Sequence, residues 1–294
     1  MKLRINIIGA GKLGQTLGYL FSHLGLATIS GIHNTTIESS QRAIKFIGEG
    51  QPYSDIKNMP FADINLITTP DDLILEKCLA LCSNTNLGAG SIFMHCSGSL
   101  TSDVLRAAKT KNCYVASIHP ASAFADPVYA VQHFKGTFCT MEGDAEALNV
   151  LEPLFGEIGG VVCKINKKNK MLYHIGCVFA ANYVVTLASQ ANTLFMEAGI
   201  NQETSSHIVL ALMKQALANL EKLKTPSLAL TGPIQRGDLA TIQSHLQALT
   251  HHQQKTLYAL LGEKTVPITE HDSHLKTSLM DLFSFSKKNE KVYP

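Results

Sequence analysis

The chain has 294 residues, of which 45% are hydrophobic and 16% charged, and its formal net charge at pH 7 is +2. This length allows two domains with separate cores, and the composition is that of a globular protein. The near-neutral charge predicts neither a nucleic acid nor an anionic membrane as a partner.

The first stretch of the chain combines a strand, a glycine turn and a helix. The apolar run Leu3–Ile8 precedes glycines at the G-x-G-x-x-G spacing of a dinucleotide-binding fold, and a helical apolar pattern follows. The first glycine permits the tight turn, the second lets a pyrophosphate approach the backbone, and the third lets the helix pack closely on the sheet. The alternative is a purely structural turn. The predicted cofactor-binding residues here are Gly9, Ala10, Gly11, Lys12, Leu13 and Gly14.

A second strand is predicted from Ala27 to Ile32, and the residues after it bear on the choice of cofactor. Asn34 stands where an Asp or Glu would bind the ribose 2′-hydroxyl of NAD. Without that carboxylate, Thr35, Thr36 and Arg42 are candidates for binding a 2′-phosphate, which favours NADP over NAD. The same residues also suit a helix N-terminus, which is compatible with either cofactor.

The strand pattern continues to about residue 165 and then stops. Further strands are predicted at 62–68, 91–95, 114–118, 137–141 and 161–165, and Thr69-Pro70 ends the first of them, where backbone commonly contacts a nicotinamide cofactor. After Asn166 the predicted elements are helices, at Met171–Ala198, Thr204–Leu223, Leu239–Leu261 and His274–Phe285. The sequence therefore predicts an α/β Rossmann domain with a doubly wound, mostly parallel sheet over residues 1–166. An all-helical domain is predicted over 167–294, with the ligand cleft between the two.

Six short motifs together carry a family resemblance that spans essentially the whole chain. They are Gly9–Gly14, Thr69–Asp72, His95–Ser99, Ser117–Pro120, Lys170–Asn182 and Thr231–Asp238. With these motifs the chain resembles the uncharacterised family described as a Rossmann-like domain followed by domain of unknown function 2520. That family is similar to a wider group of 3-hydroxyacid, pyrroline-5-carboxylate, ketopantoate and prephenate dehydrogenases or reductases. The resemblance implies the fold and a nicotinamide cofactor, and it names no substrate.

Two comparisons within that wider group concern site residues. The 3-hydroxyacid dehydrogenases have a catalytic Lys followed four residues later by an Asn. Here the residue four positions after Lys170 is His174, and the first Asn after Lys170 is Asn182. The prephenate enzymes have a strand-end His-Pro preceded by a serine turn. The matching residues in this chain are Ser97, Ser99 and His119.

Hydride transfer to a carbonyl or imine requires a proton donor and groups that position the substrate. His119 is predicted at the C-terminal end of a strand, where it can exchange a proton near neutral pH, unless it is a turn histidine beside Pro120. Lys170 and His174 share a helix face. The predicted catalytic residues are therefore His119, Lys170 and Asn182, the last two on the same helix. The alternative is that Lys170 is a solvated residue at the start of this helix and that His174 and Asn182 are core residues. The predicted substrate-binding residues are Ser97, Ser99, His174 and Arg236, while Asp238 has a sufficient structural role as a helix N-cap.

The remaining patterns concern partners and compartment. Seven cysteines without a C-x-x-C spacing indicate reduced thiols, and the early glycine turn leaves no room for a signal peptide, so a cytoplasmic location is predicted. The twelve histidines show no H-x-x-x-H or H-E-x-x-H spacing, so no metal site is predicted. Polar residues interrupt the apolar stretch Met171–Met196 too often for a membrane span. A buried helix in a homodimer of the helical domains is expected instead.

Together these patterns predict an NAD(P)-dependent oxidoreductase. It would transfer hydride between NADP(H), or NAD(H), and a small, acidic carbonyl, imine or hydroxyacid substrate. The alternative is a protein that senses NADP(H) without doing chemistry.

Overall fold

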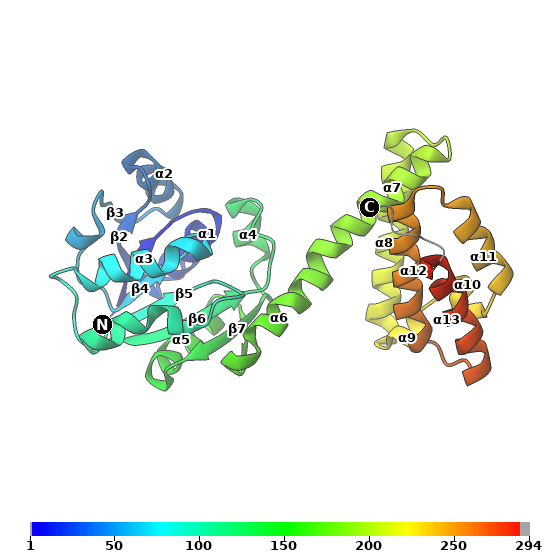
Figure 1. The fold of residues 1–294 in the computed structure, drawn as a ribbon. Helices are drawn as coiled ribbons and strands as arrows, with labels where there is room; N and C mark the ends of the chain where they lie inside the picture. The colour runs from blue at the N-terminus through cyan, green and yellow to red at the C-terminus, as the bar shows by residue number, and fades with distance from the viewer. Residues whose placement is uncertain (1, 289–294) are drawn as a thin grey trace, which may run out of the picture. The chain divides into compact units, whose positions relative to one another are not determined.

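The computed structural model describes residues 2–288 and divides into two compact units, the first ending at Ala180 and the second beginning at Ala181 (Figure 1). The first unit therefore extends beyond residue 166 and includes the start of the long apolar helical segment. Each unit has its own core, as the length of the chain predicts.

The first unit is built on an eight-stranded sheet in the order β3-β2-β1-β4-β5-β6-β7-β8. The pairs from β3 to β6 are parallel, which is the doubly wound arrangement predicted, and the reversal of strand order lies between β1 and β4. The strands are β1 (Leu3–Ile8), β2 (Ala27–His33), β3 (Gln51–Pro52), β4 (Ile64–Ile67), β5 (Ile92–His95), β6 (Tyr114–Pro120), β7 (Phe138–Gly143) and β8 (Val161–Lys164).

β7 pairs antiparallel with β6, so that Pro120 stands opposite Cys139 and Ser117 opposite Glu142. The connection between these strands therefore begins and ends at the same end of the sheet. It contains the short helix α4 (Pro127–His133), which the sequence analysis did not predict.

Helices cover both faces of the sheet. α1 (Lys12–His23), α2 (Ile37–Ile47) and α5 (Ala145–Glu157) contribute to one core cluster. α3 (Asp71–Cys82) and the 3-10 helices η1 (Ile56–Asn58) and η2 (Ser102–Lys111) contribute to the other. The four residues of β5, Ile92–His95, are all buried, as is typical of a parallel strand covered on both faces.

The predicted helix Met171–Ala198 is present as three consecutive segments. α6 (Lys170–Cys177) follows the 3-10 turn η3 (Lys167–Asn169), a π-helical turn η4 (Val178–Asn182) comes next, and α7 (Tyr183–Glu197) completes the stretch. By length and composition the run Lys167–Glu197 could cross a membrane, but one such helix is weak evidence of a membrane protein. None of its apolar window is buried inside the chain, and its burial in a homodimer stays a prediction.

The second unit is helical, as predicted. It contains α7, α8 (Gln202–Leu223), α9 (Pro226–Ala229), α10 (Pro233–Arg236), α11 (Leu239–Ala248), α12 (His252–Thr265), the 3-10 turn η5 (Val266–Ile268) and α13 (Ser273–Lys288). The predicted single helix Leu239–Leu261 is wrong, because the extended backbone of Leu249 and His251 separates α11 from α12. The predicted loop around Pro233 contains a single helical turn, α10.

Candidate functional site

The glycine turn after β1 has the geometry of a dinucleotide-binding turn. Gly9 has a φ of +87°, and a Cβ there would lie 2.6 Å from Cγ2 of Thr69. A Cβ on Gly14 would lie 2.5 Å from Oγ1 of Thr68, so the first turn of α1 packs directly on the end of β4. Around Gly11 the nearest heavy atom to a Cβ is 3.9 Å away, which leaves this backbone open to a ligand. Each glycine thus has the surroundings that its predicted role requires.

The N-terminus of α1 is open to an anionic group. Gly11 is its N-cap and offers no side-chain cap, so the first amide groups of the helix have no side chain to accept their hydrogen bonds. Oγ1 of Thr69, beside the turn, is buried and has no hydrogen-bond partner. Unpaired donors at a helix N-terminus and an unsatisfied hydroxyl fit the pyrophosphate of a dinucleotide.

A cavity of about 550 Å³ extends from this turn across the ends of β1, β2 and β4, and its volume is typical of a small-molecule site. It is lined by Gly9, Ala10, Gly11, His33, Asn34, Thr35, Ser39, Thr68, Thr69, Pro70, Leu73 and Lys77. Seven of the predicted cofactor-binding residues are among them, namely Gly9, Ala10, Gly11, Asn34, Thr35, Thr69 and Pro70.

The other predicted cofactor residues lie outside this lining. Lys12, Leu13 and Gly14 belong to the first turn of α1, and Thr36 caps α2 by accepting a hydrogen bond from the backbone N–H of Ser39 at 3.2 Å. Arg42 is exposed on α2.

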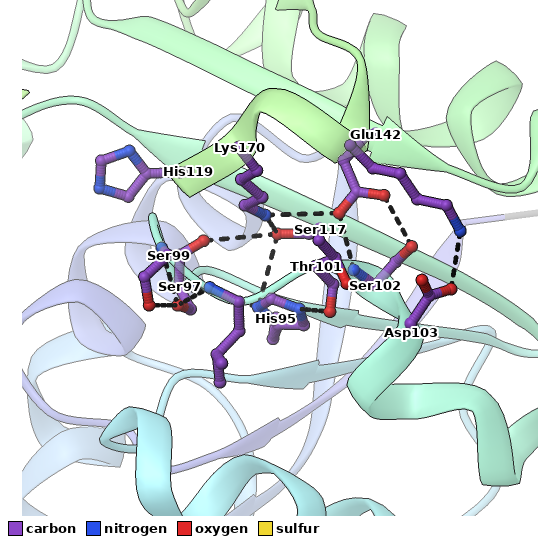
Figure 2. A network of polar contacts seen from close by, with 12 residues as sticks. His95, Ser97, Ser99, Thr101, Ser102, Asp103, Ser117, His119, Glu142 and Lys170 are labelled. Carbon is purple, nitrogen blue, oxygen red and sulfur yellow. Dashed lines mark hydrogen bonds and ion pairs between the residues drawn. The ribbon is translucent and has the colours of Figure 1, made fainter. Parts of the chain in front are cut away.

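A second polar cluster lies around the C-terminal ends of β5 and β6, and its centre is a buried lysine (Figure 2). The side chain of Lys170 is 1% exposed; its ammonium group donates to the hydroxyl of Ser117 and lies 3.5 Å from Oε1 of Glu142. The carboxylate of Glu142 also accepts hydrogen bonds from the N–H and the hydroxyl of Ser102, both at 2.7 Å. Burial lowers the pKa of Lys170, and Glu142 opposes that change.

His95 fixes the serine turn that follows β5. Its Nδ1 accepts the N–H of Ser97 at 3.1 Å, and its Nε2–H donates to the carbonyl of Thr101 at 3.2 Å. Burial, helped by the charge of Lys170, lowers its pKa to about 4, so the imidazole is neutral at pH 7. This neutral histidine holds both ends of the turn, a role that the sequence analysis did not predict.

The predicted substrate-binding serines are held by a carboxylate next to the cofactor cavity. The hydroxyls of Ser97 and Ser99 donate to Oδ2 of Asp71 at 2.8 and 2.7 Å. Oγ of Ser97 also accepts the backbone N–H groups of Ser99 and Leu100, so it stabilises the turn. Asp71 directly follows Pro70, which lines the cavity, and therefore connects the cavity to the serine turn.

His119 and His174 meet at Gly98. A Cβ on Gly98 would lie 2.6 Å from Nδ1 of His174 and 3.0 Å from Nε2 of His119, so both imidazoles pack against this bare backbone. Nδ1 of His119 is 2.8 Å from the hydroxyl of Tyr173, and Nδ1 of His174 is buried without a partner. The predicted helix face of Lys170 and His174 is thus directed at the sheet.

The state of His119 differs from the sequence-based expectation. Burial, His174 and Lys170 lower its pKa to about 4, whereas Asp71 acts in the opposite direction. The imidazole is therefore neutral at pH 7 and does not carry the exchangeable charge near neutrality that its residue type suggests. In this state it can accept a proton or donate a neutral hydrogen bond.

Asn182 and Arg236 belong to the second unit. Asn182 is exposed in the π-helical turn, and Arg236 ends α10. Asp238 caps α11 as predicted, accepting the backbone N–H of Thr241 at 3.1 Å and its hydroxyl at 2.7 Å.

Cysteines and metal ligands add no further group to the site. Burial raises the pKa of the Cys96 thiol, which agrees with an inert side chain. Among residues 2–288 no group of three or more His, Cys, Asp or Glu side chains is arranged to hold a metal ion.

Several residues of this site are not apparent from the sequence alone. Asp71 stands in a recognisable Thr-Pro-Asp-Asp motif, and only its tertiary contact with the serines reveals its role. Glu142 and Tyr173 have no distinguishing local pattern, because their partners come from distant segments. Lys77 has none either, and the fold places it in a cavity wall with residues from distant segments.

Family models match both parts of the chain. Residues 1–120 match the model of the Rossmann-like domain, and residues 137–265 match that of the domain of unknown function DUF2520. Comparison with curated proteins gives no match.

Solved structures share the fold over most of the chain. A candidate NADP oxidoreductase from Bacteroides fragilis has a TM-score of 0.70 at 20% identity, covering 88% of this chain and 96% of its own. A protein from Thermotoga maritima has a TM-score of 0.67 at 23% identity, covering 96% and 99%. An imine reductase from Myxococcus stipitatus, solved with NADP+, has a TM-score of 0.65 at 15% identity, covering 94% and 99%.

The wider group named by the resemblance is represented among structures of this fold by a pyrroline-5-carboxylate reductase from Coxiella burnetii and a prephenate dehydrogenase from Aquifex aeolicus. At these levels of identity the likeness shows the fold and not the reaction. The chain combines a Rossmann-like domain with a DUF2520 domain, which confirms the family resemblance carried by its motifs.

Proposed function

We propose that the protein is an oxidoreductase that binds NADP(H) and transfers hydride between it and a small carbonyl, imine or hydroxyacid substrate with an acidic group. The observation that carries this proposal is the cavity at the glycine turn, whose described lining residues include no Asp or Glu. A carboxylate at the end of β2 would favour the ribose hydroxyl of NAD and repel a 2′-phosphate.

Structures with the same fold support NADP as the cofactor. The imine reductase from Myxococcus stipitatus was solved with NADP+, and a pyrroline carboxylate reductase from Plasmodium falciparum was solved with NADP bound. When bound, the nicotinamide supplies or accepts the hydride. The residues suited to hold the cofactor are the glycine turn, Asn34, Thr35 and Thr69.

For the proton we favour His119. It is partly exposed and neutral, and it lies beside the serine turn that Asp71 joins to the cavity, so it can accept a proton from a substrate hydroxyl or amine as hydride leaves. Lys170 is enclosed by Ser117 and Glu142, which suits it to hold His119 and its surroundings in place. Roles for His174, Asn182 and Arg236 toward the substrate stay predictions of the sequence.

The experiment that tests this function is NADPH oxidation with a panel of small carbonyl and imine compounds. His119→Ala is expected to keep cofactor affinity and to lose roughly 100-fold or more of the turnover, as removal of a proton-transfer group does. His133→Ala, on the exposed end of α4, is the matched control and should behave as the wild type. Failure of both NADPH and NADH to bind would overturn the proposal.

A second function, that of an NADP(H) sensor, is favoured by two observations. The Lys-x-x-x-Asn pair of the 3-hydroxyacid dehydrogenases is absent, and Lys170 is buried beneath the site. Tight NADPH binding without turnover of any compound in the panel would favour the sensor over the enzyme.

We also propose that a second copy of the chain covers the exposed apolar helix. Leu172, Phe179 and Val185 are 69%, 64% and 70% exposed, more than large apolar side chains usually are in a lone soluble subunit. Polar residues such as Asn182 and Gln190 interrupt the run, which suits a protein partner better than lipid. Light scattering should give about twice the 31.9 kDa of one chain; a single-chain mass would reject this proposal.

A further inference from the structure

One cation stands in the wall of the cofactor cavity. Lys77 lies on α3, its side chain is 22% exposed, and among the described residues that line the cavity it is the only one with a permanent positive charge. Its ammonium is 2.7 Å from the carboxylate of the neighbouring Glu76, whose side chain is 64% exposed. An ion pair whose carboxylate is exposed in this way contributes little, and the ammonium readily exchanges it for a better partner.

The ionisable side chain beside Lys77 in the cavity wall, His33, carries no positive charge at pH 7. Nδ1–H of His33 donates to the carbonyl of Tyr53 at 3.0 Å, so Nε2 carries a lone pair. The side chains of His33 and Lys77 both line the cavity. Burial lowers the pKa of His33, and the charge of Lys77 lowers it further. His33 is therefore neutral at pH 7 and offers no charge to an anion.

Polar groups at the end of β2 complete this part of the cavity. Thr35 is exposed, Ser39 is partly exposed, and both line the wall. The amide of Asn34 donates to the hydroxyl of Ser39 at 3.0 Å, which leaves the hydroxyl hydrogen of Ser39 for another acceptor. Hydroxyl donors beside an ammonium suit a phosphate, which carries close to two negative charges at pH 7.

The arginine that the sequence suggests for this purpose is elsewhere. Arg42 is exposed on α2 and does not line the cavity, although it follows the end of β2 more closely in the chain. Lys77 lies on α3, the helix after β4, and the tertiary structure places its side chain in the wall of the cavity.

We propose that Lys77, with the hydroxyls of Thr35 and Ser39, binds the 2′-phosphate of NADP(H) and so sets the preference for NADP(H) over NAD(H). This inference rests on the proposed cofactor and adds the residue that selects it. Because NAD(H) lacks the phosphate, loss of the ammonium affects the binding of NADP(H) alone.

The test is calorimetric binding of NADPH and of NADH to the wild type, Lys77→Met and Arg42→Met. Lys77→Met is expected to raise the Kd for NADPH about tenfold or more, the effect of losing a charge-assisted bond, and to change the Kd for NADH less than about threefold. Arg42→Met removes an equal charge outside the cavity and should leave both constants close to those of the wild type. Lys77→Arg keeps the charge and should retain most of the preference.

The outcomes separate this inference from the proposed function. Equal effects of Lys77→Met on NADPH and NADH, or a loss of preference in Arg42→Met instead, would overturn the role of Lys77 and leave the cofactor proposal standing. If the wild type binds neither nucleotide, both proposals fall. Should Lys77→Met fail to fold, Lys77→Gln gives the same comparison with a polar side chain.

Discussion

Lys170 and Glu142 form an ion pair inside the first unit, with side chains 1% and 4% exposed and 3.5 Å between Nζ and Oε1. The antiparallel pairing of β6 and β7 places Glu142 opposite Ser117, and the ammonium of Lys170 reaches both. Each charge is costly to bury alone, so each requires the other. The pair therefore attaches the start of α6 to the sheet and holds β6, the strand that contains His119.

Breaking this pair should destabilise the first unit strongly. Lys170→Met leaves the carboxylate of Glu142 buried without its cation and is expected to cost about 3–5 kcal/mol of unfolding free energy. Lys167→Met is the control, because its ion pair with Asp103 is exposed at 48% and 60% and should contribute less than about 1 kcal/mol. Urea titrations measure both variants. Similar losses in the two would contradict a structural role for the buried pair.

The histidine that fixes the serine turn should make stability depend on pH. The pKa of His95 is about 4 in the folded protein and 6.5 in its ordinary state, so the unfolded chain binds the proton more readily between these values. The contribution of His95 is complete above pH 6.5 and is lost as the pH falls toward 4, to an extent of about 3 kcal/mol. Urea midpoints measured across this range should fall less steeply for His95→Gln. An unchanged slope would show that His95 does not resist protonation.

The glycine turn offers a matched pair of substitutions. Gly9 and Gly48 have φ of +87° and +84°, but a Cβ on Gly48 meets nothing within 4 Å, whereas one on Gly9 lies 2.8 Å from the backbone nitrogen of Thr69. Gly48→Ala should cost only the backbone strain, about 1–2 kcal/mol. Gly9→Ala should cost more and should also abolish NADPH binding, measured by calorimetry. If Gly9→Ala bound NADPH normally, the cofactor would not use this turn.

Local patterns in the sequence account for what could be predicted. The apolar runs predicted as strands are the buried strands β1, β4 and β5. The glycine spacing identifies the turn, because the role of each glycine depends on a few neighbouring residues. Asp238 is recognised as a cap for the same reason, since its partner Thr241 is three residues away. Arguments of this kind need no knowledge of how distant segments meet.

The relations that define the site depend on distant segments. β7 has the pattern of any strand, and only its antiparallel pairing with β6 brings Glu142 beside Ser117 and Lys170. In the sequence, nothing distinguishes Lys77 from a solvated residue of a helix. It lines the cavity because α3 begins shortly after the end of β4. The low pKa of His119 likewise follows from burial and from His174, neither of which can be inferred from a strand-end His-Pro.

The contact of both imidazoles with Gly98 leads to a prediction about catalysis. A Cβ on Gly98 would lie 2.6 Å from His174 and 3.0 Å from His119, so Gly98→Ala must rotate one or both rings away. We expect kcat/KM for any substrate found in the carbonyl panel to fall roughly tenfold or more, because displaced catalytic groups no longer align with the substrate. The affinity for NADPH should be unchanged. Gly156→Ala on α5 is the control, since a Cβ there meets nothing within 4 Å. The ring signals of His119 and His174 in NMR spectra report the displacement without a substrate. Shifted rings with undiminished turnover would exclude these two histidines from the reaction.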